Sequence, residues 1–257
     1  PCGTLFPYTT LFRSVCDFKV LEDKEELHIT LPHTTKGQMQ VRIEFEGTLN
    51  DMLYGFYRSK YQVDGEDRYM ATTQFEERDA RAAFPCFDHP AKKAEFDIEF
   101  IIDEKLQAIS NTAIREENPL GNGTKLVQFE TTPPMSTYLL YFGVAEFEFL
   151  EDASKSPKIR VATTPGKIQY GKFALDVGRK SIDFGEEFTG VKYPLSKCDH
   201  IAVADFAAGA MENFGDITYR ENALLVHPGK TAKPTLVRVG SVIAHETAHM
   251  WFGDIVS

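Results

Sequence analysis

Three residues near the end of the chain have the types and the spacing for metal-dependent hydrolysis. The segment His245-Glu246-Thr247-Ala248-His249 has the pattern H-E-x-x-H. Positions i and i+4 share one face of a helix, so His245 and His249 can present two imidazole nitrogens to one zinc ion. Glu246 would lie beside that ion and could accept a proton from a water molecule that zinc activates. The pentad alone does not establish a zinc site, so other segments of the chain have to support it.

A second segment, Gly209-Ala210-Met211-Glu212-Asn213, precedes the pentad in a loop rich in alanine and glycine. This GAMEN segment followed by H-E-x-x-H resembles the aminopeptidase N family of zinc metallopeptidases, the gluzincins that include leukotriene hydrolase. The resemblance extends to four flanking segments and covers roughly Asp17 to Ser257. They are Ala71–Pro90 (ATTQFEERDARAAFPCFDHP), Met135–Tyr138 (MSTY), Gly215–Glu221 (GDITYRE) and Trp251–Asp254 (WFGD).

The resemblance implies one zinc ion per chain, with Glu246 as the general base of peptide hydrolysis. An exopeptidase must also measure the distance from the reacting carbonyl to a free α-ammonium group, and carboxylates do this by charge-assisted hydrogen bonds. In the family the GAMEN glutamate, here Glu212, has this role. Glu76 matches a second carboxylate for the amine, and Gln74 matches a position that lines the substrate.

The backbone of the GAMEN segment is expected to run beside the substrate like an added edge strand. Gly209 gives that backbone conformational freedom, because glycine has no side chain. Ala210, Met211 and Asn213 are the other expected substrate-binding residues of the segment. The expected partner is therefore a peptide with a free N-terminus. The expected reaction is removal of N-terminal residues.

Several parts of the family pattern have no match in these 257 residues. The resemblance places the third zinc ligand on a glutamate about eighteen residues beyond the second histidine, and the chain ends at Ser257 before reaching it. The tyrosine that steadies the tetrahedral intermediate, the C-terminal helical domain and the first strands of the β domain are also unmatched. We therefore expect a truncated piece of a zinc aminopeptidase that is inactive, or nearly so, by itself.

Three alternatives stay open at this point. A thermolysin-type endopeptidase would share H-E-x-x-H without needing Glu212. A bifunctional epoxide hydrolase and aminopeptidase, like leukotriene hydrolase, would share every motif. A non-catalytic module would only capture peptide N-termini.

The elements that must position these residues begin with short alternating segments, which favour β structure. Alternation runs through Phe18–Leu31 and again through Met39–Phe45, and turn clusters separate the strands that follow. Those later strands are predicted at Tyr69–Phe75, Ala94–Ile102, Ala108–Ile114, Lys125–Thr131 and Tyr138–Leu150. The pattern predicts a β-rich N-terminal domain, an antiparallel sandwich or saddle, over residues 15–152.

Residues 153–257 are predicted to form the first part of a thermolysin-like α/β catalytic domain. Strands are expected at Lys158–Thr163, His200–Ala204 and Asp216–Tyr219. Helical spacing runs over Ile168–Phe188, with Phe173, Val177, Ile182, Phe184 and Phe188 on one face. A last helix starts near Pro234 and carries the metal pentad in its final turns. Residues 1–14 fit neither domain and are interpreted as a non-native junction.

Composition and charge limit the partners and the compartment that the protein can have. A net charge of −10 argues against nucleic acid or an anionic membrane as a partner. The four cysteines form no C-x-x-C pair, so buried free thiols are expected. No apolar run approaches the ~18 residues that span a bilayer, and no signal peptide opens the chain. The compartment stays open, with the cytoplasm slightly favoured, and the oligomeric state is not predicted.

Overall fold

The computed structural model describes residues 14–34 and 36–256. The chain divides into two compact units, one ending at Phe45 and the other running from Glu46 to Ser257. The predicted junction, residues 1–14, lies outside the described part of the chain except for Ser14. No helix among the described residues is both long and apolar enough to cross a membrane.

The first unit contains one antiparallel hairpin, β1 (Asp17–Leu21) and β2 (Glu26–Thr30). The predicted strand Met39–Phe45 is wrong, because residues 38–49, all described, form neither helix nor strand. Alternation makes a strand possible, but a strand forms only where a neighbour supplies ladder hydrogen bonds. None of the described residues pairs with 38–49.

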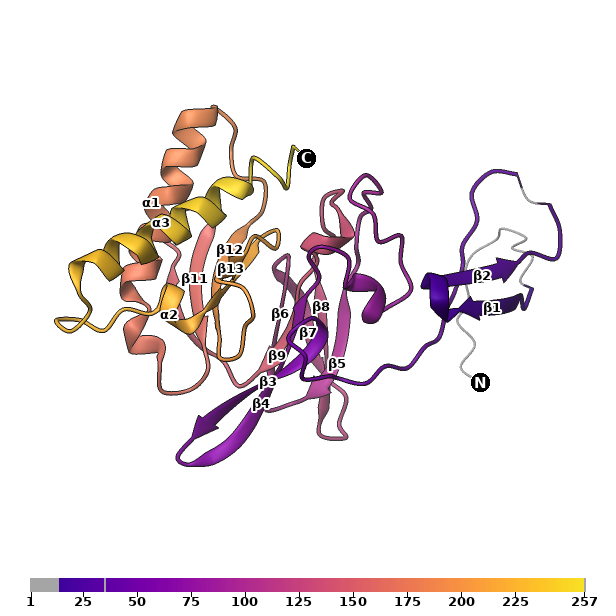
Figure 1. Ribbon diagram of the computed structural model, residues 1–257, viewed down its shortest axis with the longest axis horizontal. Helices are drawn as coiled ribbons and strands as arrows, with labels where there is room; N and C mark the ends of the chain where they lie inside the picture. The colour runs from indigo at the N-terminus through magenta and orange to yellow at the C-terminus, as the bar shows by residue number, and fades with distance from the viewer. Residues whose placement is uncertain (1–13, 35, 257) are drawn as a thin grey trace. The chain divides into compact units, whose positions relative to one another are not determined.

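The second unit begins with two antiparallel sheets (Figure 1). A four-stranded sheet has the order β3-β4-β9-β6, formed by Gly55–Val63, Glu66–Gln74, Phe142–Ala145 and Gln107–Ser110. A three-stranded sheet has the order β5-β8-β7, formed by Glu99–Asp103, Thr124–Phe129 and Ile114–Pro119. These sheets confirm the predicted antiparallel β domain as a fold class.

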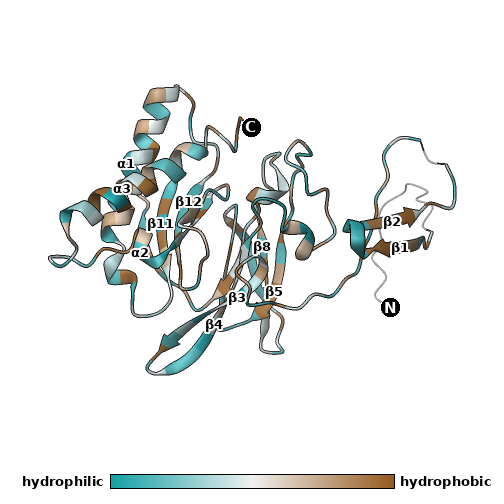
Figure 2. Cartoon of the chain, viewed as in Figure 1, coloured by the Kyte–Doolittle hydropathy of each residue, from teal (hydrophilic) through white to brown (hydrophobic). Residues whose placement is uncertain are grey.

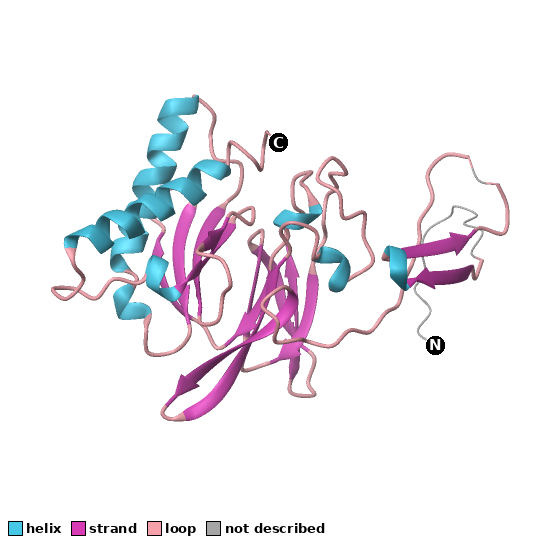
Figure 3. Cartoon of the chain, in the orientation of Figure 1, coloured by secondary structure: helices cyan, strands magenta, loops and turns pink. Residues whose placement is uncertain are grey.

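The remainder of the second unit is a five-stranded sheet covered by helices, as Figures 1 and 3 show. Its order is β10-β11-β12-β14-β13, formed by Glu148–Asp152, Lys158–Thr163, Lys197–Val203, Asp216–Arg220 and Ala210–Met211. Strands β11, β12 and β14 are parallel, whereas β10 and β13 run antiparallel at the two edges. The helices are α1 (Lys172–Thr189), α2 (Glu221–Leu224) and α3 (Lys233–His249), and α1 packs on both the sheet and α3. This arrangement confirms the predicted start of an α/β domain.

One cluster of buried apolar side chains joins the four-stranded sheet to the five-stranded one. Tyr61 and Met70 of the first sheet belong to the same cluster as Ile201 and Ile217 of the second. Every residue of β12 is buried, as expected for a parallel strand that is covered on both faces, although Figure 2 shows hydrophilic and hydrophobic residues mixed along this sheet. The shared core fixes the β sheets against the α/β sheet within this unit.

Further predicted elements differ from the structure in their bounds; for example, predicted Ala94–Ile102 is β5 at Glu99–Asp103, and predicted Ala108–Ile114 ends as β6 at Ser110. The predicted strand Tyr138–Leu150 is three elements, a 3-10 turn at Thr137–Leu139 followed by β9 and β10. Strand β9 pairs with β4 and β6 but β10 pairs with β11, so the chain passes from one sheet to the other between them.

Helix α1 begins at Lys172, later than predicted, because Ile168–Tyr170 forms a 3-10 turn. Phe184 and Phe188 are not on its buried face, since their side chains are 65% and 71% exposed. The helix instead buries Ala174, Leu175, Gly178, Arg179 and Ile182. At 3.6 residues per turn, positions 184 and 188 are centred about 120° around the helix axis from 178 and 182, outside the buried face.

Candidate active site

The two histidines of the predicted zinc site lie on α3, one turn apart and on the same side. Ile243 and Thr247 are fully buried and hold the opposite face of the helix against the core. His245 is exposed and His249 is half-buried, so both rings face an accessible space. Their Nε2 atoms are 3.3 Å apart, and their rings are nearly perpendicular at 87°.

This pair of nitrogens fits a zinc ion. With Zn–N bonds of about 2.0–2.1 Å and tetrahedral angles, two ligating nitrogens lie roughly 3.3 Å apart. The Nε2 atoms of His245 and His249 already have that separation. The two side chains can therefore supply two zinc ligands without changing rotamer.

The chain after α3 selects the tautomer of His249. Its Nδ1 lies 3.1 Å from the carbonyl oxygen of Phe252, to which an Nδ1–H group donates. The Nε2 lone pair is then free for a metal, which is the usual arrangement for a histidine ligand. Gly253 makes this turn possible, because its φ is +136° and a Cβ there would lie 3.1 Å from Nδ1 of His249.

Glu246 is almost completely buried beside the histidines, with 8% of its surface exposed. Desolvation raises the pKa of its carboxyl to about 7, and the negative charges of Glu212 and Glu76 add to this rise. A carboxyl group with a pKa near neutrality can both accept and return a proton at physiological pH. This is the property that the predicted general base needs.

Glu212 reaches the same place from the loop between β12 and β14. Ligand atoms of Glu212, Glu246 and His249 all lie within 4.8 Å of one another. Among residues 14–34 and 36–256 this is the only such group of three, and His245 is outside it, although its Nε2 lies 3.3 Å from that of His249. The structure therefore brings the loop carboxylate and the helix carboxylate to one metal-sized space.

Glu76 and Gln74 come from the end of β4 and the residues after it. Partial desolvation, followed by the charges of Glu212 and Glu77, raises the pKa of Glu76, and His249 opposes the rise. Glu76 thus belongs electrostatically to the same cluster. Gln74 is buried, and its Oε1 has no hydrogen-bond partner among the described residues.

The rest of the GAMEN segment forms the edge of the five-stranded sheet. Ala210 and Met211 are strand β13, which pairs with β14, and the Gly209 carbonyl accepts a hydrogen bond from the Arg220 N–H. Asn213 is fully buried and its side-chain amide donates to Thr218 Oγ1, so this side chain faces the interior. The outer edge of β13 is free of strand partners among the described residues.

Two further residues belong to the site although no role was predicted for them. Desolvation and the charges of Glu212, Asp254 and Glu76 raise the pKa of the Tyr138 phenol to about 12. Asp254 is 1% exposed, and neither of its carboxylate oxygens has a hydrogen-bond partner within the described ranges. Both lie in segments that the resemblance includes, MSTY and WFGD, but a matching segment does not show where a side chain points.

Comparison with known proteins gives matches over most of the chain. Residues 9–139 match the model of the peptidase M1 N-terminal domain, and residues 173–257 match that of the peptidase family M1 domain. The match to puromycin-sensitive aminopeptidase of Caenorhabditis elegans is 48% identical over 235 residues, or 90% of this chain and 25% of the relative.

Two further relatives agree with these matches. Aminopeptidase M1 of Arabidopsis thaliana is 49% identical over 228 residues, covering 88% of this chain and 26% of the relative. Aminopeptidase 2, mitochondrial, of Saccharomyces cerevisiae is 46% identical over 224 residues, covering 86% and 23%. The chain thus spans about a quarter of the length of the curated relatives it matches. With both domain models matched in order and the two carboxylates meeting at the H-E-x-x-H helix, the chain belongs to peptidase family M1, the aminopeptidase N family.

Proposed function

We propose that the protein is a zinc-dependent aminopeptidase, which hydrolyses N-terminal residues from peptides. One observation carries the proposal: ligand atoms of Glu212, Glu246 and His249 lie within 4.8 Å of one another. A hydrolytic base and a candidate amine-binding carboxylate therefore face the same space. Aminopeptidase is also the activity in the names of the three relatives described above.

His245 and His249 would hold the zinc ion as two of its protein ligands. When bound, zinc lowers the pKa of a water molecule and polarises the scissile carbonyl. Glu246 accepts the proton of the attacking water and returns it to the leaving amine. Its carboxyl pKa of about 7 suits both transfers near neutral pH.

Glu212 and Glu76 would bind the α-ammonium group of the substrate. The carboxylates of the site repel one another, since the negative charge of Glu212 raises the pKa of both Glu76 and Glu246. A cation placed among them relieves this repulsion and gains charge-assisted hydrogen bonds. A peptide whose N-terminus is acetylated has no such cation and should bind poorly.

The edge strand β13 would align the peptide. Because β13 lies at the edge of its sheet, the backbone of the half-buried Ala210 can pair with an extended substrate, whereas Met211 is buried. Main-chain pairing of this kind accepts many sequences, since it uses no side chain of the substrate. Glu212 follows Met211 directly, so the strand ends at the amine-binding carboxylate.

The test compares aminoacyl-p-nitroanilides with their N-acetyl counterparts, using the zinc-loaded full-length protein. Release of p-nitroaniline from the free-amine substrates alone is the expected result. Equal hydrolysis of both would indicate an endopeptidase, and turnover of a lipid epoxide in a parallel assay would indicate the bifunctional enzyme.

A further inference from the structure

One buried amide side chain connects the loop that carries Glu212 to the β domain. Asn111 directly follows β6 and is 1% exposed. Its Nδ2 group donates to the carbonyl oxygens of Leu139, at 2.7 Å, and Phe214, at 2.9 Å. Its Oδ1 accepts a hydrogen bond from the Tyr141 N–H at 2.9 Å. The amide thus uses both donor hydrogens and its acceptor on three backbone groups.

These three backbone groups belong to two segments that line the active site. Phe214 lies two residues after Glu212, and Leu139 directly follows Tyr138. The Phe214 N–H also donates to the Leu139 carbonyl at 3.2 Å, so the two segments touch directly beside the amide. The Asn111 side chain therefore sets the spacing between the segment of Tyr138 and the loop of Glu212.

The backbone of Asn111 restrains the same loop. Gly215 has a φ of +83°, and a Cβ at this position would lie 2.4 Å from the Asn111 carbonyl oxygen. Only glycine allows this close approach and this backbone conformation together. The loop can reach Asn111 at this point only because residue 215 has no side chain.

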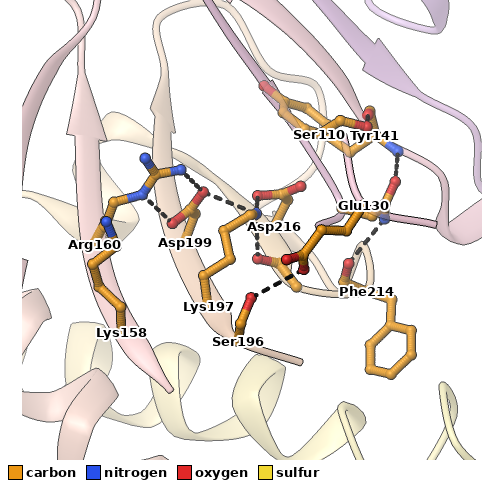
Figure 4. Close-up of polar contacts among 12 residues, drawn as sticks. Ser110, Glu130, Tyr141, Lys158, Arg160, Ser196, Lys197, Asp199, Phe214 and Asp216 are labelled. Carbon is orange, nitrogen blue, oxygen red and sulfur yellow. Dashed lines mark hydrogen bonds and ion pairs between the residues drawn. The ribbon is translucent and has the colours of Figure 1, made fainter. Parts of the chain in front are cut away.

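On its other side, the same turn is held by a buried ion network of the five-stranded sheet (Figure 4). Lys197 donates to the Gly215 carbonyl at 3.2 Å and pairs with Asp216 and with Asp199, which in turn pairs with Arg160. Lys197, Asp199 and Asp216 are nearly or fully buried. This network fixes the turn to β12 and β14, whereas Asn111, together with the Phe214–Leu139 hydrogen bond, connects it to the β domain.

We propose that Asn111 is a positioning residue that holds Glu212 at the distance from zinc required for binding the substrate's α-ammonium group. The inference rests on the proposed aminopeptidase function. It extends that function to a residue that touches neither zinc nor substrate. The amide acts through the carbonyl of Phe214, and its loss would let the end of the GAMEN segment move away from the Tyr138 segment.

The test uses Asn111→Asp in the zinc-loaded full-length protein, with Ser110→Ala as the matched control. Aspartate has nearly the same shape but places an oxygen opposite the Leu139 and Phe214 carbonyls. Ser110 is equally buried and donates to the Tyr141 carbonyl at 2.8 Å, but none of its hydrogen bonds reaches the loop of Glu212. Both variants disturb one buried polar side chain in the same segment.

Dissociation constants are measured by calorimetry for two zinc-binding ligands, an amino-acid hydroxamate and acetohydroxamate, which lacks the amine. Asn111→Asp is expected to weaken the amino-acid hydroxamate by about 10-fold or more, because a charge-assisted hydrogen bond is lost. It should change acetohydroxamate less than about two-fold, and Ser110→Ala should change neither. A purely structural role would weaken both ligands alike.

Equal weakening of both ligands, or of neither, in Asn111→Asp would overturn the inference while leaving the aminopeptidase proposal in place. A wild-type protein that binds the two hydroxamates equally would overturn both proposals, because no amine recognition would exist to be positioned. If Asn111→Asp does not fold, Asn111→Ala is judged by the same ratio. The ratio is independent of turnover, so it separates positioning from general loss of activity.

Discussion

The two carboxylates of the site, Glu246 and Glu212, are held in opposite ways. Glu246 lies on α3 with both histidines, and the helical repeat alone brings the three side chains together. Glu212 lies in a loop that has only the two-residue strand β13 as regular structure. One half of the site is therefore local in sequence, whereas the other depends on distant contacts.

Those distant contacts hold the Glu212 loop at both ends. At its start, Asp205 accepts hydrogen bonds from Tyr57 Oη and the Lys60 N–H, and its own N–H donates to Ser59 Oγ. At its end, Phe214 is held by Asn111. The partners precede the loop by about 100 residues or more, so a single helix holds the proposed general base and zinc ligands, whereas contacts with the β domain place the proposed amine-binding carboxylate.

The largest expected effect comes from Glu246, the carboxylate on helix α3. Glu246→Gln should lower kcat by about 10²–10⁴-fold, because the amide cannot accept the proton of the attacking water. Zinc binding should persist, since the His245 and His249 nitrogens do not depend on Glu246. Stopped assays with an aminoacyl-p-nitroanilide and metal analysis of the purified variant check both statements. A kcat within a few-fold of wild type would remove Glu246 from the mechanism.

The same contrast explains what could be predicted from the sequence. The helix that carries H-E-x-x-H was predicted from near Pro234 to Phe252 and is observed at Lys233–His249, so its start was predicted well, because its proline and its apolar face are local signals, whereas its end was placed three residues too late. Strand β11 is observed at Lys158–Thr163, as predicted, since a short apolar alternation beside turn residues identifies it. Local signals suffice where one element contains the whole pattern.

Other features could not be predicted, because they depend on a partner. Strand β3 alternates buried residues with Arg58, Lys60 and Gln62, and pairing with β4 decides its structure. Residues 39–45 alternate as regularly, yet form no strand. The expected role of Glu212 followed from the resemblance, but the hydrogen bonds of its loop with Asn111, through Phe214, and with Tyr57, through Asp205, required the fold. Asp254 lies only five positions after His249, and its burial gives no sequence signal.

The next smaller effect is expected for His200 in the five-stranded sheet, and it concerns the stability of the fold. His200 on β12 is fully buried, its Nδ1 contacts Tyr219 Oη at 2.9 Å, and a Cβ on Gly178 would meet its Nε2 at 2.3 Å. Desolvation lowers the pKa of this histidine to about 4, opposed by the negative charge of Asp199. The unfolded chain, with a histidine pKa near 6.5, therefore binds the proton first as the pH falls.

The stabilisation from neutral His200 is complete above about pH 6.5 and is lost as the pH falls toward 4. The whole shift corresponds to roughly 3 kcal/mol, of which about 2 kcal/mol is lost by pH 5. Urea unfolding of the wild type and of His200→Gln at pH 7 and pH 5 measures the difference between their pH dependences. If the two proteins lose the same stability on acidification, His200 is not the group responsible.

The distant half of the site gives the next smaller effect. Glu212→Gln keeps the shape of the side chain but removes its charge, so KM for free-amine substrates should rise by about 10- to 150-fold. The effect on kcat should be smaller, because Glu246 and the histidines are unchanged. Steady-state kinetics with an aminoacyl-p-nitroanilide measures both constants. A fall in kcat with an unchanged KM would assign Glu212 to the chemical step instead of amine binding.

The smallest expected effect concerns the hydrogen bond between Tyr57 and Asp205, which holds the start of the Glu212 loop. Tyr57→Phe removes the 3.0 Å hydrogen bond to the Asp205 carbonyl, and Asp205 is exposed enough for water to replace it. We expect a loss of about 1 kcal/mol in unfolding free energy and a small rise in KM for free-amine substrates. Tyr61→Phe is the control, because Tyr61 lies on the same strand but bonds to Glu146 instead of the loop.

The double variant with Tyr57→Phe and Asn111→Asp tests whether the two ends of the loop act independently on the affinity for the amino-acid hydroxamate. If each anchor fixes its own end, the two losses in affinity for the amino-acid hydroxamate should add within about 0.5 kcal/mol. If the loop between Asp205 and Phe214 moves as one body, the second substitution should cost much less than it does alone, because the first has already released Glu212. Full additivity would show that Asn111 and Tyr57 act on Glu212 independently. Strong coupling would show instead that the β domain holds the amine-binding carboxylate through the whole loop.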